Sequence, residues 1–271
     1  MSAFNGYVQG TTFHITYDFC EDAERVQKDI DSLFRVIDES MSLYDSTSLL
    51  SKVNRMTDTA IMVDEHFYNV FTLSKKINRE SEGAFNPALY PLIQYWGFGA
   101  GNIPFPEQTP IRTIDSLKAL CDFSGFSMEV RNDGYLLIKR KPYLRLDFNA
   151  IAQGYTVDVI ADYFQLSGIE NYMIEVGGEV RTAGVNHENK PWRIGIDKPV
   201  APDQPRELIA IANLSNRSLA TSGSYRKFYM KNGTKYSHTI DPGTGYPVQH
   251  NLISVSFFAP TAAEADGYAT A

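Results

Sequence analysis

Two short turn signatures constrain the fold of this chain more than any other feature of its sequence. Asn132-Asp133-Gly134 and Asn232-Gly233 each lie between short runs typical of β-strands. Sequences of this kind join neighbouring strands by a tight reversal, and strands joined in this way pair antiparallel. The expected strand pairs are 127–131 with 135–140, and 228–230 with 236–239.

Hydrophobic periodicity adds helices to these strands. Residues 12–19 alternate between apolar and polar, which predicts a half-buried strand. Apolar residues spaced by three and four predict helices over 22–41, over a segment that follows Asp64 as N-cap, and over 151–166. Further strands are expected at 172–176, 179–183, 192–196, 208–214 and 253–259. The pattern predicts an α+β protein of mostly antiparallel sheets with packed helices. We expect a single domain over 1–271, either undivided or built as two sub-lobes.

Composition excludes several classes of protein. The 271 residues are 43% hydrophobic and 21% charged, which is typical of a globular domain. With 25 Lys and Arg against 32 Asp and Glu, the net charge is −7, so we expect no nucleic-acid partner. Two cysteines, Cys20 and Cys121, exclude a Cys₄ zinc site and an iron–sulfur cluster and leave one disulfide open. The N-terminus has no signal-peptide pattern, so we expect any export signal to be absent from this chain.

The C-terminal segment carries a candidate metal site. Thr261 and Glu264 have the spacing of a helix capping box. Asp266 and Thr270 are four residues apart, so they share one face of that helix. A carboxylate beside a hydroxyl is a hard-oxygen pair suited to Mg²⁺, which takes few protein ligands. The alternative is an ordinary solvated helix face.

Residues 144–155 form a second candidate. We expect a strand that ends at Asp147 and a helix that begins near Ile151. A helix N-terminus of this kind accepts phosphates, and a free carbonyl at the junction could bind a cation. The alternative is a plain turn capped by Asp147 or Asn149. Gly177 and Gly178 interrupt a strand pattern nearby, which predicts either a bulge or a close approach to the backbone.

A histidine and an aromatic segment complete the candidates. His238 lies near a strand end in a stretch rich in Gly and Pro, where an aimed imidazole could act as a general base. Asp241 is close enough in sequence to orient it, although a plain hydrogen-bonded histidine is the alternative. The aromatic residues of 83–98 could line a site for a flat ring or form core.

In this order, the segments resemble one family, the ApbE-type FAD:protein FMN transferases. The likeness covers nearly the whole chain. The matching blocks are Gly-Thr-Thr-Phe-His (10–14), Met-Ser-Leu-Tyr-Asp (41–45), Gly-Ala-Phe-Asn-Pro (83–87), Trp-Gly-Phe (96–98), Leu-Asp-Phe-Asn-Ala-Ile-Ala-Gln-Gly-Tyr (146–155), Val-Gly-Gly (176–178), Ala-Thr-Ser-Gly (220–223), His-Thr-Ile-Asp-Pro-Gly-Thr-Gly-Tyr-Pro (238–247) and Ala-Asp-Gly-Tyr-Ala-Thr (265–270).

The resemblance implies a flavoprotein that acts as a magnesium-dependent transferase. It binds FAD, splits the pyrophosphate, passes FMN to a Thr or Ser hydroxyl of a target protein (protein flavinylation) and releases AMP. The implied metal ligands are Asp266, Thr270 and the backbone carbonyl of Ala150. The implied flavin-nucleotide contacts are Tyr44, Ala84, Phe85, Asn86, Asp147 and Ile240, with Gln9 and Gln153 where the family often has Met and Lys. His238 is the candidate catalytic residue, the base that accepts the target's proton.

The resemblance also implies a setting and leaves alternatives. Members are commonly periplasmic or otherwise extracytoplasmic, and many are membrane-associated lipoproteins, so we expect contact with a membrane only through an anchor absent from this chain. An FAD pyrophosphatase would use the same site with water in place of the protein hydroxyl. A flavin-binding carrier without turnover is the third possibility, and the metal-ligand pair argues against it.

Overall fold

The computed structural model describes residues 1–18, 22–101, 103–200, 204–205, 207–225 and 227–271. The chain folds into two compact units: the first comprises 1–37, 151–226 and 252–270, and the second 38–150, 227–251 and 271. Two positions named in the sequence analysis lie outside the described residues. They are Phe19, the last residue of the predicted strand 12–19, and Cys20, one of the two cysteines. No helix among the described residues is long and apolar enough to span a bilayer.

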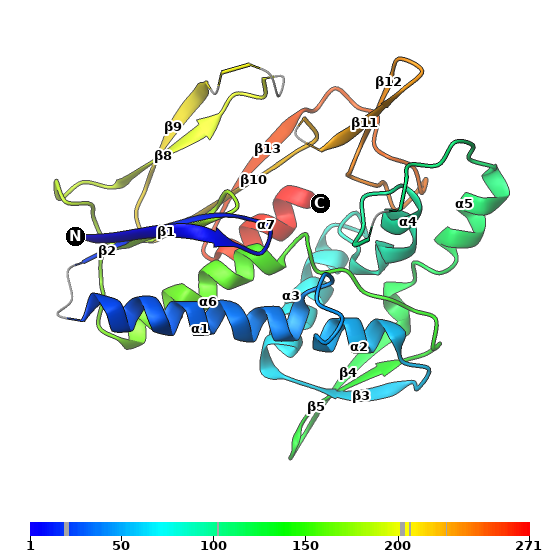
Figure 1. The fold of residues 1–271 in the computed structure, drawn as a ribbon, viewed down its shortest axis with the longest axis horizontal. Helices are drawn as coiled ribbons and strands as arrows, with labels where there is room; N and C mark the ends of the chain where they lie inside the picture. The colour runs from blue at the N-terminus through cyan, green and yellow to red at the C-terminus, as the bar shows by residue number, and fades with distance from the viewer. Residues whose placement is uncertain (19–21, 102, 201–203, 206, 226) are drawn as a thin grey trace. The chain divides into compact units, whose positions relative to one another are not determined.

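A six-stranded antiparallel sheet forms the centre of the first unit (Figure 1). Its strands, in spatial order, are β1 (Ser2–Val8), β2 (Thr11–Tyr17), β6 (Tyr172–Val176), β7 (Glu179–Ala183), β10 (Ser218–Gly223) and β13 (Ser254–Ala259). A separate antiparallel pair is formed by β8 (Trp192–Asp197) and β9 (Leu208–Leu214). The strands predicted from the sequence are confirmed as β2, β6, β7, β8, β9 and β13. Strands β1 and β10 were not predicted.

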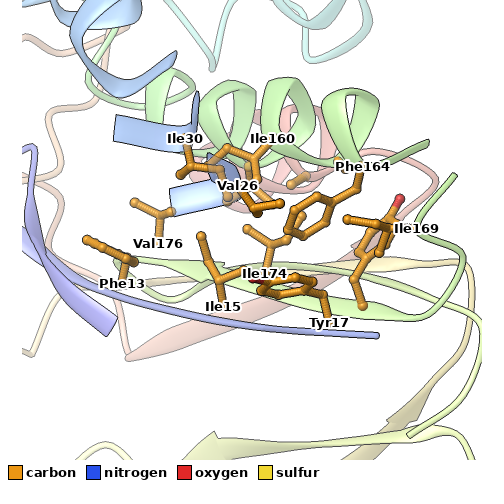
Figure 2. Close-up of a cluster of buried hydrophobic side chains, with 14 of the residues drawn as sticks. Phe13, Ile15, Tyr17, Val26, Ile30, Ile160, Phe164, Ile169, Ile174 and Val176 are labelled. Atoms are coloured by element: carbon orange, nitrogen blue, oxygen red, sulfur yellow. The ribbon is translucent and has the colours of Figure 1, made fainter. Parts of the chain in front are cut away.

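Helices cover this sheet and complete the hydrophobic core. They are α1 (Ala23–Met41) and α6 (Ala152–Leu166), both close to their predicted limits, and α7 (Ala262–Thr270), which begins directly after the predicted cap residue Thr261. Figure 2 shows side chains of α1 and α6 pointing towards those of β2 and β6. The labelled core residues are Phe13, Ile15, Tyr17, Val26, Ile30, Ile160, Phe164, Ile169, Ile174 and Val176. Burial of these large apolar side chains, at about 1.5–3 kcal/mol each, holds the helices on the sheet.

Gly177 and Gly178 form a two-residue hairpin turn and not a bulge. Val176 pairs with Glu179 across the turn, so the two glycines separate β6 from β7. Their φ angles are +69° and +111°, values that residues with a Cβ rarely adopt. The two strands expected at 172–176 and 179–183 are thus confirmed, and the bulge that the glycines suggested is corrected to a tight reversal between them.

The second unit combines helices with two small antiparallel sheets. Its helices are α2 (Leu49–Arg55), α3 (Glu65–Glu80), η1 (Pro87–Leu89), α4 (Tyr90–Tyr95), α5 (Ile111–Lys118) and η2 (Phe123–Gly125). Its strands are β3 (Ala60–Val63), β4 (Phe126–Arg131), β5 (Gly134–Lys139), β11 (Phe228–Lys231) and β12 (Thr234–Ser237), arranged as β3-β5-β4 and β11-β12. Both predicted hairpins are confirmed, and Asp64 caps α3 by accepting a hydrogen bond from the Phe67 N–H at 2.8 Å.

The aromatic segment of this unit belongs largely to its core. Trp96 and Phe98 are 2% and 5% exposed and pack with Leu92, Ile114 and Ile240 in one cluster. The Trp96 indole N–H donates to the Gly245 carbonyl at 2.9 Å. Of the two roles expected for the aromatic residues of 83–98, these two rings therefore form core and do not line a site for a flat ring.

Residues 144–148 do not form the predicted strand. Leu144, Leu146 and Phe148 are buried, as one face of a strand would be, but Asp147 between the last two is buried as well. Instead of pairing with another strand, Leu146 makes both backbone hydrogen bonds, each 2.8 Å long, with the side-chain amide of Asn54. The Asp147 N–H donates to the Pro87 carbonyl at 2.7 Å. A buried amide side chain thus replaces the strand partner that the periodicity implied.

Replacing Asn54 by alanine tests whether its side chain stabilises the segment around Leu146. The change leaves the N–H and the carbonyl of fully buried Leu146 without partners, which costs about 2–4 kcal/mol of unfolding free energy. We expect a lower urea midpoint with an unchanged slope. Asn213→Ala, on the exposed surface of β9, is the control and stays within about 0.5 kcal/mol of the parent. Equal stability of the two variants would contradict this account.

Candidate active site

The predicted site residues divide between the two units. The first unit contains Gln9, Gln153, Asp266 and Thr270; the second contains Tyr44, Ala84, Phe85, Asn86, Asp147, Ala150, His238 and Ile240. Ala150 ends a segment of the second unit, and its part in metal binding stays a prediction from the sequence.

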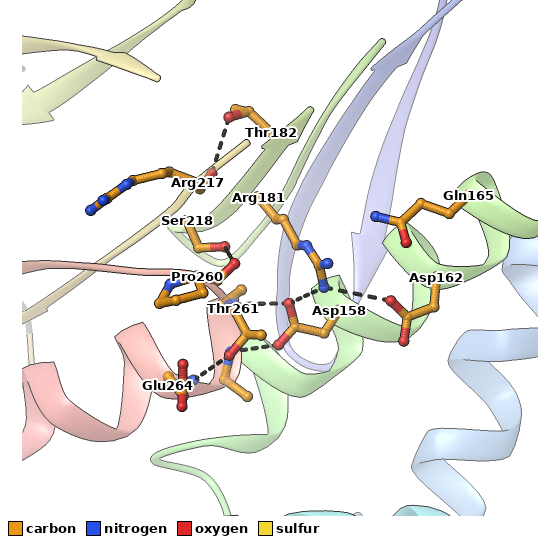
Figure 3. A network of polar contacts seen from close by, with 12 residues as sticks. Asp158, Asp162, Gln165, Arg181, Thr182, Arg217, Ser218, Pro260, Thr261 and Glu264 are labelled. Atoms are coloured by element: carbon orange, nitrogen blue, oxygen red, sulfur yellow. Dashed lines mark hydrogen bonds and ion pairs between the residues drawn. The ribbon is translucent and has the colours of Figure 1, made fainter. Parts of the chain in front are cut away.

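The first turn of α7 is held by two side chains. Thr261 Oγ1 accepts from the Glu264 N–H at 3.3 Å, which confirms one half of the predicted capping box. The two carboxylate oxygens of Asp158 accept from the N–H groups of Ala262 and Ala263, each at 2.8 Å (Figure 3). The first backbone donors of a helix have no partner within it, so these contacts satisfy three of them.

Asp158 reaches this position from α6, and an arginine of β7 neutralises it. The Arg181 guanidinium donates to Asp158 Oδ1 at 2.8 Å, and the side chains are 16% and 11% exposed. Burial raises the pKa of Asp158, while Arg181 and the two backbone N–H groups oppose that shift. Sequence reasoning missed this residue, although an acid among the apolar residues of the predicted helix 151–166 was a signal that could have found it.

Asp266 is buried in the next turn of α7. The residue is 8% exposed, and its Oδ2 accepts from the Gly154 N–H at 3.2 Å. Burial, together with the charge of Asp158, raises the pKa of Asp266 to about 7, against the hydrogen bond from Gly154. A cation beside this carboxylate would favour its ionised form.

Gly154 permits this contact because it has no side chain. A Cβ at position 154 would lie 2.4 Å from the Ala262 carbonyl oxygen, which is a backbone atom and not the end of a flexible side chain. The start of α6 and the start of α7 therefore approach closer than any other residue type allows.

Asp266 and Thr270 lie one turn apart on α7, as the sequence predicted. Within the part of the chain that the structure describes, no cluster of three or more His, Cys, Asp or Glu side chains could hold a metal ion. The candidate metal site of the first unit is therefore one carboxylate and one hydroxyl, and a bound ion would complete its coordination with other oxygens.

Gln9 and Gln153 lie together in the first unit. Gln9 Nε2 donates to Thr156 Oγ1 at 3.1 Å, and Gln153 Nε2 donates to the Gln9 carbonyl at 3.5 Å. Gln153 also borders the β6–β7 turn, because a Cβ at Gly177 would lie 3.0 Å from its Oε1. The β6–β7 turn at 177–178, the start of α6 and the β1–β2 loop thus meet at these two glutamines.

In the second unit, Asp147 and Tyr44 share an electrostatic environment. Asp147 is 6% exposed, and burial raises its pKa to about 6, although Lys227 and the Asn149 N–H at 2.8 Å oppose the shift. Partial desolvation and the nearby Asp147 charge raise the pKa of Tyr44. Tyr44 is 68% exposed as a whole residue, so its ring offers surface for stacking.

Four further predicted contacts of the second unit differ in what they can offer. The Phe85 ring is 2% exposed and Ile240 is 5% exposed, so both rest in the core as the structure stands. Asn86 caps η1 by accepting from the Ala88 N–H at 2.8 Å, and Ala84 is exposed. Roles for these residues in binding stay predictions, and only Tyr44 and Ala84 present exposed side chains.

The His238 imidazole is held by a backbone carbonyl. Its Nδ1 lies 3.1 Å from the Lys227 carbonyl oxygen, and the ring packs edge-on against Phe98. A carbonyl only accepts, so Nδ1 carries the hydrogen and Nε2 keeps its lone pair. Burial and the Lys227 charge lower the pKa of His238, which favours the neutral ring at pH 7, while the Lys227 carbonyl opposes this shift.

Asp241 does not orient this ring. Its Oδ1 accepts from the Gly243 N–H at 2.8 Å and its Oδ2 from the Thr244 hydroxyl at 2.9 Å. Both oxygens thus shape the turn that follows β12, and the proximity of Asp241 to His238 in sequence was misleading.

Comparison with known proteins places this arrangement in a family. The profile of the ApbE family matches residues 9–271. The FAD:protein FMN transferase of Vibrio cholerae is 37% identical over 272 residues, covering 98% of this chain and 79% of that protein. That of Haemophilus influenzae is 33% identical over 274 residues, covering 99% and 79%. The solved structure of flavin transferase ApbE from Vibrio cholerae matches with a TM-score of 0.87 at 35% identity, over 99% of this chain and 85% of that one.

The chain therefore belongs to the ApbE family. The resemblance seen in the ordered sequence blocks is confirmed, and so is the α+β fold with antiparallel sheets.

The state of His238 can be measured directly. We expect ¹⁵N NMR to show a neutral ring protonated at Nδ1, with a pKa below the ordinary 6.5. Because the unfolded chain then binds this proton more tightly, His238 lowers the stability of the fold as pH falls through about 6.5. A ring protonated at Nε2, or a pKa above 6.5, would contradict the geometry.

Proposed function

We propose that this member of the ApbE family transfers FMN from FAD to a Thr or Ser hydroxyl of a target protein, with Mg²⁺ at Asp266 and Thr270. Matched relatives are named FAD:protein FMN transferases, which supports the reaction. The observation that carries the site is the buried Asp266 carboxylate, one helical turn from a hydroxyl, on a helix whose start is fixed by other residues.

The residues of α7 fit a magnesium ion. Asp266 is a hard-oxygen donor whose ionised form burial disfavours, and among the described residues no Lys, Arg or His side chain forms an ion pair with it. Thr270 adds a second hard oxygen one turn later. Mg²⁺ suits such a site because it commonly keeps waters and substrate phosphates among its ligands. When bound, it would neutralise charge on the FAD pyrophosphate.

His238 is suited to accept the proton of the acceptor hydroxyl. The Lys227 carbonyl fixes Nδ1 as the donor, so Nε2 is the basic atom, and the lowered pKa keeps it unprotonated at neutral pH. The hydroxyl oxygen then bonds to the phosphorus on the riboflavin side of FAD. The bond from this phosphorus to the bridging oxygen breaks, and AMP leaves. The Thr or Ser becomes a phosphoester of riboflavin.

We further infer a periplasmic or otherwise extracytoplasmic setting with a lipid anchor for the full-length protein. The resemblance to an exported family supports this inference. Fractionation of cells that express the full-length protein tests it, and recovery in the cytosolic fraction would contradict it.

One assay separates transfer from its alternatives. Purified protein is incubated with FAD and Mg²⁺, with and without an acceptor domain that a matched relative modifies. We expect a fluorescent acceptor band and AMP in equal amounts. AMP without an acceptor would instead indicate a pyrophosphatase, and bound FAD with neither product would indicate a carrier.

Asp266→Asn tests the metal site. The amide keeps an oxygen for the Gly154 N–H but removes the charge, so we expect Mg²⁺ binding by calorimetry and Mg²⁺-dependent turnover to be lost in a folded protein. In the parent, a proton competes with the ion, so affinity falls up to about tenfold per pH unit below about pH 7 and is level above it. Glu264→Gln removes a charge from the same helix as a control, and equal losses in both variants would contradict the assignment.

His238→Ala tests the base. A general base typically contributes about 10²–10⁴-fold to the rate, so we expect kcat to fall by that factor with FAD affinity little changed. The acidic limb of the pH–rate profile should vanish. His187→Ala, at an exposed position, is the control. A lower melting temperature with near-normal turnover per folded molecule would show that His238 is only structural.

A further inference from the structure

The helix that carries the proposed metal ligands is anchored by a residue that lies outside them. Asp158 is separated by more than one hundred positions from Ala262 and Ala263, whose N–H groups it binds. It is 7% exposed as a whole residue, and both of its carboxylate oxygens are occupied. It is therefore not available as a ligand itself.

Two contacts, one turn apart on α6, join that helix to α7. Gly154 donates its N–H to the Asp266 carboxylate, and Asp158, four residues later, binds the first two N–H groups of α7. The missing side chain at Gly154 keeps the two helices at the distance where both contacts form. Together they fix both the start of α7 and the side chain of Asp266.

We propose that Asp158 is a positioning residue for the metal site: by fixing the first turn of α7, it sets the direction of Asp266 and Thr270 without touching metal or substrate. This inference rests on the proposed function. It assigns to the α6–α7 junction a role in metal affinity that goes beyond holding the fold together.

The chemistry at this junction requires a carboxylate. Three donors converge on Asp158: two backbone N–H groups and the Arg181 guanidinium, all at 2.8 Å (Figure 3). An asparagine has the same shape, but whichever way its amide is turned, its NH₂ group faces one of these donors. Asp158→Asn therefore loses at least one contact and displaces the start of α7.

The neighbouring residues offer matched controls. Asp162 contacts the same Arg181 at 3.6 Å, but its side chain is 66% exposed, so Asp162→Asn removes an equal charge without touching α7. Thr261→Ala removes a hydrogen bond of about 1 kcal/mol from the cap of α7 and leaves both links to α6 in place. The first variant controls for charge, and the second for stability.

The experiment measures Mn²⁺ binding to each variant without FAD, from the signal of free Mn²⁺ in electron paramagnetic resonance. Each protein is held well below its melting temperature. Replacing partners that orient metal ligands commonly costs 10–100-fold in affinity, and we expect that loss for Asp158→Asn. Asp162→Asn and Thr261→Ala should stay within about threefold of the parent. If Asp158→Asn does not fold, Asp158→Glu replaces it; the longer side chain keeps the charge but moves the carboxylate, and a loss of the same kind is expected.

The outcomes separate this inference from the proposed function. A parent that binds Mn²⁺ and an Asp158 variant that binds it equally well would overturn the positioning role alone. An equal loss in Thr261→Ala would overturn it too, because lowered stability of α7 would then explain the effect. A parent that does not bind Mn²⁺ would overturn the metal site and this inference together.

Discussion

The close approach of α6 and α7 is the contact on which the rest of the candidate site depends. It exists because position 154 has no Cβ, which would otherwise meet the Ala262 carbonyl oxygen at 2.4 Å. The sheet places α7 here, since β13 ends at Ala259 and only two residues separate it from the start of the helix. The hydrophobic core formed by α1, α6 and the sheet holds the other side of the contact in place. In the first unit, the packing of the helices on the sheet therefore also determines the geometry of the candidate site.

The two buried carboxylates at this junction, Asp158 and Asp266, differ in the groups that compensate their negative charge. Asp158 receives a guanidinium and two backbone N–H groups from the protein. Asp266 receives one N–H group, from Gly154, and burial raises its pKa to about 7 against that hydrogen bond. A buried carboxylate without a cationic partner is costly unless it is protonated or binds a cation. This asymmetry accounts for the structural role of the first residue and supports a metal-binding role for the second. In the second unit, the Lys227 carbonyl binds Nδ1 of His238, so Nε2 is the nitrogen that can act as a base.

Local sequence signals predicted much of this fold because they act over a few residues. The hairpin turns, the periodic helices, the Asp64 cap and the one-turn spacing of Asp266 and Thr270 are all of this kind. The errors arose where distant residues decide. The strand expected before Asp147 is absent because Asn54, 92 positions away from Leu146, takes its backbone bonds. Asp158 has its partners 104 and 105 positions away, so no spacing rule could reveal it. Phe85 matched a family block, but burial of its ring is a property of packing that the block does not encode.

The most direct test of this account is to locate the metal in a crystal of the protein soaked with Mn²⁺, by anomalous diffraction. We expect a peak at the ~2.1 Å coordination distance typical of Mg²⁺-type sites from the Asp266 carboxylate and the Thr270 hydroxyl. We also expect Asp158 to keep its contacts with α7 and not to touch the ion. A peak at other residues, with none beside Asp266, in a crystal form that still releases AMP from FAD, would show that Asp266 is not a metal ligand.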